Sequence, residues 1–138
     1  MVNNLLITIL CSSKKEILDK AILSVVNQIN AQINYDIVII VNTLDNQYYN
    51  EIVNLYSGKY KIIRTESNGR PGKGHNSCIS TFNNLRKYDS LFILDGDDLL
   101  YPYALSQLVY TIRSNNSDAI LLFMYDSYMI SKYNNYFD

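Results

Sequence analysis

The sequence predicts an α/β domain in which helices flank a mostly parallel central sheet. Short runs of β-branched and apolar residues alternate along the chain with segments whose apolar residues recur every three or four positions. This alternation is typical of parallel sheets, because each helix carries the chain back to the start of the next strand. An acidic cluster, Asp95, Asp97 and Asp98, directly follows the fourth apolar run and marks one sheet edge as a place for chemistry.

Length and composition limit the classes of partner. A chain of 138 residues, 48% hydrophobic and 18% charged, fits a single domain with its own core. The formal net charge of -1 provides no basic face, so we expect no nucleic-acid partner. No apolar run reaches the roughly 18 residues of a membrane span, and LLITILC lacks the flanks of a signal peptide. We therefore expect a soluble, cytoplasmic protein.

The first two strand–helix units are predicted as follows. LLITIL (5–10) forms a strand, and Ser13 with Glu16 has the capping-box spacing that starts a helix. YDIVIIV (35–41) is a continuous β-branched run, as expected of a strand covered on both faces. A helix follows, with Gly58 as its expected C-cap. The apolar stripes of the two helices are Ile17, Leu18, Ala21, Ile22, Val25 and Val26, then Tyr49, Ile52, Val53 and Tyr56.

The remaining chain predicts three more strands and two helices. The strands are YKIIR (60–64), SLFILD (90–95) and DAILLFMY (118–125), and the glycine-rich segment 65–76 is expected to be a loop. Pro102 lies near the first turn of the last helix, where proline is tolerated. The helical stripes are Cys78, Ile79, Phe82 and Leu85, then Leu105, Leu108, Val109 and Ile112. No repeat or linker divides the chain, so residues 1–138 form one predicted domain.

The acidic cluster favours a bound cation. Ligands of open α/β sheets bind beyond the carboxyl ends of the strands, where this cluster falls. Two unit charges about 4 Å apart repel by about 4 kcal/mol at an effective dielectric near 20. A hard divalent ion, Mg²⁺ or Mn²⁺, relieves this repulsion and gives its other coordination sites to water and substrate phosphates. The alternative is a simple turn in which Asp98 starts the next helix.

The order of ITILCSS, YDIVIIVN, SNGRPGKGHN, LFILDGDD and YPYAL resembles the nucleotide-binding half of a GT-A glycosyltransferase of the family 2 type. The resemblance covers about residues 5–125 and implies a Rossmann-like nucleotide-binding domain. In that family a strand-end D-x-D motif holds a divalent metal on the diphosphate of the donor. By position the motif is Asp95-Gly96-Asp97, with both aspartates as metal-binding residues and Asp97 as the expected direct ligand.

The same resemblance implies contacts to the nucleoside. Cys11 and Ser12, at the end of the first strand, match positions that contact it. Asn42 and Thr43 stand where an acidic pair that reads base and ribose is common, and Asp45 is near enough in sequence to substitute. These differences leave the choice between uridine and another base open.

Around the third helix the resemblance implies contacts to the donor from GKGHNS. Lys73 and Asn76 are expected to face the donor together with Asp95. His75 occupies a position that arginine often holds in the family, and as the one histidine of the chain it provides no histidine-rich metal site. A solvent-facing histidine without a role is the competing interpretation.

The implied function is a metal-dependent, hexosyltransferase-like transfer from a UDP- or GDP-sugar to an acceptor hydroxyl, with inversion. The acceptor-binding half of the family, which supplies the base, should follow the fifth strand, so the resemblance implies a domain truncated before that half and assigns no base. The acceptor is unknown, and a homo-oligomer is open. A non-catalytic nucleotide-sugar-binding module is one alternative; a phosphatase of the haloacid-dehalogenase type, which also uses a strand-end D-x-D, is the other.

Overall fold

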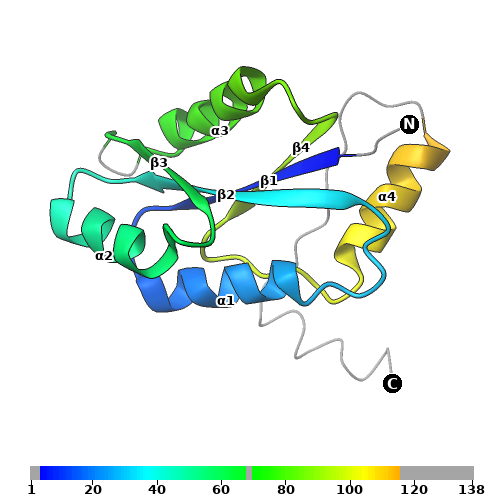
Figure 1. The fold of residues 1–138 in the computed structure, drawn as a ribbon, viewed down its shortest axis with the longest axis horizontal. Helices are drawn as coiled ribbons and strands as arrows, with labels where there is room; N and C mark the ends of the chain where they lie inside the picture. Colours follow the sequence, from blue (N-terminus) through cyan, green and yellow to red (C-terminus); the bar gives the residue numbers. More distant parts are fainter. Residues whose placement is uncertain (1–3, 68–69, 116–138) are drawn as a thin grey trace.

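The computed structural model describes residues 4–67 and 70–115 and confirms the α/β class (Figure 1). Strands and helices alternate throughout this part of the chain. In order they are β1 (Asn4–Cys11), α1 (Lys15–Val26), β2 (Asn34–Asn42), α2 (Asn46–Tyr56), β3 (Lys61–Thr65), α3 (Pro71–Leu85), β4 (Ser90–Asp95) and α4 (Ala104–Ser114). The predicted fifth strand, 118–125, lies outside the described residues.

The sheet is parallel with strand order β3-β2-β1-β4. The chain adds β2 and β3 on one side of β1 and then crosses to add β4 on the other side. At such a reversal of direction, the ligands of open α/β sheets bind beyond the carboxyl ends of the two strands that flank it. In this protein those strands are β1 and β4, in which Leu10 pairs with Asp95.

The two faces of the sheet are covered unequally. Helices α1 and α2 lie on one side of the sheet and α3 on the other, as Figure 1 shows. Because side chains alternate between faces along a strand, neighbours in sequence enter different cores. The larger core joins alternate residues of β1 and β2 to α1, α2 and α4; the smaller one packs Leu6, Val38 and Ile40 against Cys78 of α3. Leu10 and Asp95 therefore face α3, whereas Cys11 faces α1 and α2.

Two predicted helix caps are wrong. No side chain caps α1: its N-cap is Lys14, in the left-handed region at φ 59, so Ser13 and Glu16 form no capping box. Instead the Lys14 carbonyl accepts from the amides of Ile17 and Leu18 at 3.2 and 3.4 Å. Helix α2 ends at Tyr56 with Ser57 as a right-handed C-cap, so the position of Gly58 requires no left-handed residue.

Two other helix starts also differ from prediction. Helix α3 begins at Pro71, within the segment expected to be a loop, because a proline in the first turn has no amide hydrogen to leave unpaired. Helix α4 begins at Ala104 with Tyr103 as N-cap. Asp98 therefore does not cap it, and Pro102 precedes its first turn.

Strand β3 forms one edge of the sheet. Its Ile62 and Ile63 are half-buried, and the exposed Lys61 lies at its start.

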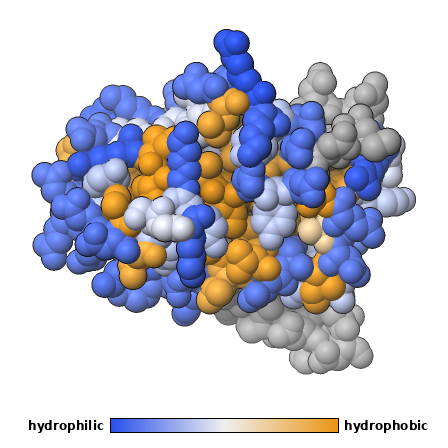
Figure 2. Space-filling view, viewed as in Figure 1, coloured by the Kyte–Doolittle hydropathy of each residue, from blue (hydrophilic) through white to orange (hydrophobic). Residues whose placement is uncertain are grey.

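Figure 2 shows apolar side chains reaching the surface in the middle of the face viewed, bordered by hydrophilic ones. Among the described helices none is long and apolar enough to cross a membrane.

Candidate functional site

The candidate site lies where β1 and β4 end. The Gly96 amide, just past β4, donates to the carbonyl of Leu10 at 2.6 Å. A Cβ at position 96 would lie 2.9 Å from that carbonyl oxygen and 3.0 Å from the Cβ of Cys11. Since neither neighbour is the end of a flexible side chain, only glycine fits. This close approach brings Ser12 and Asp97, both exposed, to the same edge of the sheet.

The backbone turns tightly at the acidic cluster. The Asp98 amide donates to the Asp95 carbonyl at 2.9 Å; Asp97 is exposed, and Asp95 and Asp98 are half-buried. Burial raises the pKa of Asp98, and the charges of Asp97 and Asp95 raise it further. The three carboxylates thus lie close together at the end of β4. Within 4–67 and 70–115, no group of three metal-ligating side chains converges.

The first turn of α3 contacts the acidic cluster. His75 Nε2 lies 3.2 Å from Asp95 Oδ1. Because the two side chains are 41% and 48% exposed, solvent screens this pair, and its main effect is to orient Asp95. The structure thus gives the half-exposed His75 a partner in Asp95.

The N-terminus of α3 also lies at this edge. Its N-cap residue, Arg70, makes no side-chain cap, and Lys73 and Asn76 are exposed. Uncapped amides at a helix start suit an anion. Gly74 permits the helix to lie close to the strands: a Cβ there would meet both terminal methyls of Leu10 at 2.9 Å and Asn42 Nδ2 at 3.0 Å.

Cys11 ends β1 but points into the core. It is 4% exposed, and burial raises the pKa of its thiol to about 11. The side chain is therefore neutral near pH 7 and is covered by α1 and α2. Of the two residues expected to contact the nucleoside from β1, Ser12 is the one whose side chain reaches the surface.

Asn42 is buried at the end of β2. Its Oδ1 accepts from Ser67 Oγ at 2.5 Å, and its Nδ2 donates to the Arg70 carbonyl at 3.1 Å. These bonds connect β2 to the segment leading into α3. The side-chain amide of Asn42 thus fixes the position of the start of α3.

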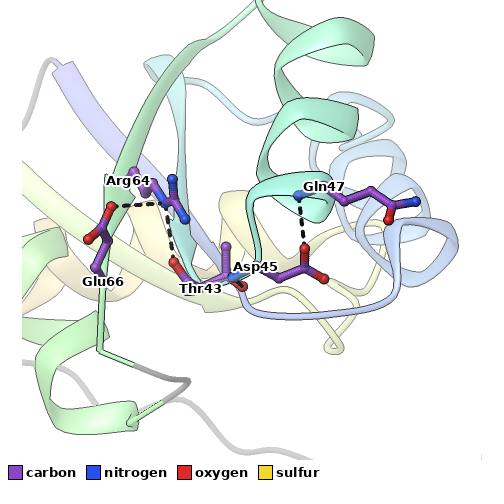
Figure 3. Close-up of polar contacts among 5 residues, drawn as sticks. All are labelled: Thr43, Asp45, Gln47, Arg64 and Glu66. Atoms are coloured by element: carbon purple, nitrogen blue, oxygen red, sulfur yellow. Dashed lines mark hydrogen bonds and ion pairs between the residues drawn. The ribbon is translucent and has the colours of Figure 1, made fainter.

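The turn after β2 forms a second polar cluster (Figure 3). Asp45 caps α2: its Oδ1 accepts from the amides of Gln47 and Tyr48 at 2.8 and 3.2 Å. Arg64 of β3 reaches across, and its Nε donates to the Thr43 carbonyl at 3.2 Å. Sequence reasoning missed Arg64; the available signal was an arginine that directly follows two isoleucines in a short strand.

The structure therefore arranges the expected site residues in two groups. The first group lies at the carboxyl edge of β1 and β4 and contains Ser12, Asp95, Asp97 and the first turn of α3. The second lies at the ends of β2 and β3 and contains Thr43 and Asp45. Cys11 and Asn42 are buried beneath these groups.

The chain matches the model of glycosyl transferase family 2 over residues 6–136. The chain belongs to this family. The expected GT-A fold is confirmed, and the phosphatase alternative loses its support.

Solved structures show the same fold at low sequence identity. The chain resembles S. aureus TarS 1-349, alone and in complex with UDP, at 20% identity and a TM-score of 0.59, covering 83% of this chain. A further structure of S. aureus TarS is 17% identical with a TM-score of 0.57, and the match covers 90% of this chain. This chain spans 34% of TarS 1-349 and 24% of that further TarS chain. Comparison with curated proteins gave no match.

Proposed function

We propose that the chain is the donor-binding domain of a metal-dependent glycosyltransferase. It binds a UDP- or GDP-sugar and transfers the sugar to an acceptor hydroxyl with inversion. The observation that carries the proposal is a pair of carboxylates in a member of glycosyl transferase family 2: Asp95 ends β4, and the exposed Asp97 follows it, at the edge beside the end of β1. Complexes of TarS with UDP and with UDP-GlcNAc favour a uridine donor.

The carboxylates fit a divalent metal. Asp95 and Asp97 offer hard oxygen ligands. Burial, followed by the charges of Asp97 and Asp95, raises the pKa of Asp98, and a bound cation would offset those charges. Mg²⁺ and Mn²⁺ are commonly held by one or two carboxylates plus substrate phosphates, so a third protein ligand is not required. When bound, such an ion stabilises the negative charge of the departing diphosphate.

Other residues of the chain bind and orient the donor. The uncapped amides of α3 and the ammonium of Lys73 supply positive charge to the diphosphate. His75 orients Asp95, and Asn42 holds the start of α3 at the edge. The turn that contains Asp45 faces the nucleoside. Binding the donor in one orientation lowers the entropy cost of attack by the acceptor hydroxyl.

Calorimetric titration of the protein with UDP, GDP and CMP, in Mn²⁺ and in EDTA, tests this proposal. We expect one nucleoside diphosphate to bind in Mn²⁺ at least about tenfold more tightly than in EDTA, a difference of about 1.4 kcal/mol. In Asp97→Asn this metal-dependent gain should disappear, because a direct ligand is lost. Glu51→Gln, a change at a half-exposed carboxylate of α2 that lies 3.9 Å from Lys15, is the control and should keep the gain. Equal affinity in Mn²⁺ and EDTA would contradict the proposal.

A further inference from the structure

Arg64 is held by three different groups although it lies on an edge strand. Its Nε donates to the Thr43 carbonyl at 3.2 Å and lies 3.4 Å from Glu66 Oε1. Its guanidinium carbon lies 4.8 Å from the ring centroid of Tyr49 on α2. The side chain is 20% exposed, so most of the surface of this charged group is covered. Figure 3 shows it reaching from β3 toward the turn after β2.

The turn that Arg64 contacts is also fastened from within. The Thr43 amide donates to the Thr65 carbonyl at 2.9 Å, which extends the β2–β3 pairing by one residue. The Asp45 amide donates to Thr43 Oγ1 at 3.0 Å. The orientation of Thr43 therefore sets the position of Asp45. The Thr43 carbonyl is used by neither of these two bonds, and it is the group that accepts from Arg64.

Arginine is suited to this place by its shape. A planar guanidinium can lie over an aromatic ring and donate in its own plane at the same time. An ammonium is a compact point charge and cannot reproduce both contacts with one geometry. A covered cation is retained only where partners compensate for lost water, as the carbonyl, the carboxylate and the ring do here.

We propose that Arg64 is a positioning residue for nucleobase selection: it fixes the Thr43–Asp45 turn in the shape that discriminates between bases. The inference rests on the proposed function, because it assumes a nucleotide at the carboxyl edge of the sheet. It concerns the end of the site that contacts the base. The diphosphate end, at Asp97 and α3, is held by other residues and should not depend on Arg64.

Titrations of UDP, CDP, GDP and inorganic diphosphate in Mn²⁺ test this role. Arg64→Ala should lower the affinity for the preferred nucleotide by about tenfold, so that it approaches the affinity for the other two nucleotides. The affinity of Arg64→Ala for inorganic diphosphate should stay within about twofold of that of the unaltered protein. General damage to the fold would instead weaken the binding of nucleotides and inorganic diphosphate alike. Arg64→Lys should retain part of the base preference, because lysine keeps the positive charge but lacks the planar guanidinium.

Variants of Tyr49 and Glu66 provide matched controls. Tyr49→Phe keeps the ring beneath the guanidinium and should keep the base preference, whereas Tyr49→Leu removes the ring and should reduce it. Glu66→Gln removes a 62% exposed carboxylate and should change the preference little. Because Arg64→Lys and Tyr49→Leu alter the same contacts less drastically, they decide the question if Arg64→Ala does not fold.

The failure of this inference is distinguishable from failure of the proposed function. If the unaltered protein shows no metal-dependent nucleotide binding, the proposed function is wrong and the inference falls with it. If that protein binds nucleotide and prefers one base, but the Arg64 and Tyr49→Leu variants keep the same preference, the role of Arg64 alone is overturned. A parallel loss of nucleotide and inorganic diphosphate affinity would also overturn it.

Discussion

Burial determines the chemistry of both cysteines. Cys11 is 4% exposed and Cys78 is fully covered, and burial raises the pKa of each thiol. The thiolate is the reactive form, so neither side chain is suited to act as a nucleophile in the folded protein. Position alone had placed Cys11 at the nucleoside, but the alternation of β1 turns its side chain toward the core.

We expect neither cysteine to react quickly with an aromatic disulfide reagent at pH 8 in the native protein. Both should react after unfolding in guanidinium. The exposed Ser12 offers a control one residue away, because Ser12→Cys should react at once in the native state. A fast-reacting thiol in the unaltered protein would show that the packing of β1 against its neighbours is wrong.

Glycines at the site are required for space. Gly96→Ala would place a methyl 2.9 Å from the Leu10 carbonyl oxygen, where the backbone must move. Overpacking of this kind costs about 1–3 kcal/mol. Gly58→Ala, with nothing within 4 Å of the new Cβ, is the control and should be neutral within about 1 kcal/mol. Denaturant unfolding of the two variants measures the difference; equal stability would contradict the close approach of β1 and β4.

At the scale of elements, the sequence predicted which segments are strands and helices better than where they end. Each strand run and each apolar helical stripe within the described residues corresponds to an observed element, because periodicity reflects burial along the whole element. Helix ends depend on single backbone conformations. Lys14 takes a left-handed φ of 59, which the Ser13–Glu16 spacing does not reveal. Pro71 was a usable signal for the start of α3, since proline favours the first helical position.

One surface contact between elements gives a pH-dependent stability. Tyr88 Oη and Lys87 Nζ, after α3, donate to Asp36 Oδ2 of β2 at 2.7 and 3.0 Å. The hydrogen bond from Tyr88, followed by that from Lys87, lowers the pKa of Asp36 below its ordinary 3.8. A depressed folded-state pKa stabilises the protein above the unfolded-state pKa, and this contribution is lost as the pH falls through the folded-state pKa.

Asp36→Asn should therefore lower stability at pH 7, by less than about 1 kcal/mol because the carboxylate is largely exposed. The difference from the unaltered protein should shrink as the pH falls below about 4. Urea unfolding between pH 2.5 and 7 checks this. Tyr88→Phe removes the hydrogen bond that shifts the pKa most, so it should reduce the pH dependence as well. A difference that stays constant with pH would show that the bonds do not favour the charged form.

At the scale of the whole molecule, strand order explains why distant residues meet. Ser12 and Asp97 are far apart in sequence, yet both lie at the edge where β1 and β4 end. The sequence placed the acidic cluster at the end of a strand, because strand-end carboxylates are visible in a linear pattern; the bound metal stays a prediction. It could not predict the bond from His75 to Asp95, the buried Asn42 or the contacts of Arg64, since each depends on how separate units pack.

The central claim is that a nucleotide and a divalent metal bind together at the β1–β4 edge. Amide NMR signals recorded with UDP and substoichiometric Mn²⁺ test it most directly, because the paramagnetic ion broadens the signals of nearby residues. The proposed site predicts strongest broadening at Ser12, Gly96 and Asp97, and little at the opposite end of the sheet, around Asp36 and Lys61. Asp97→Asn should remove the effect. Broadening centred on Asp36 and Lys61, or none at Gly96 and Asp97 while UDP is bound, would contradict the account.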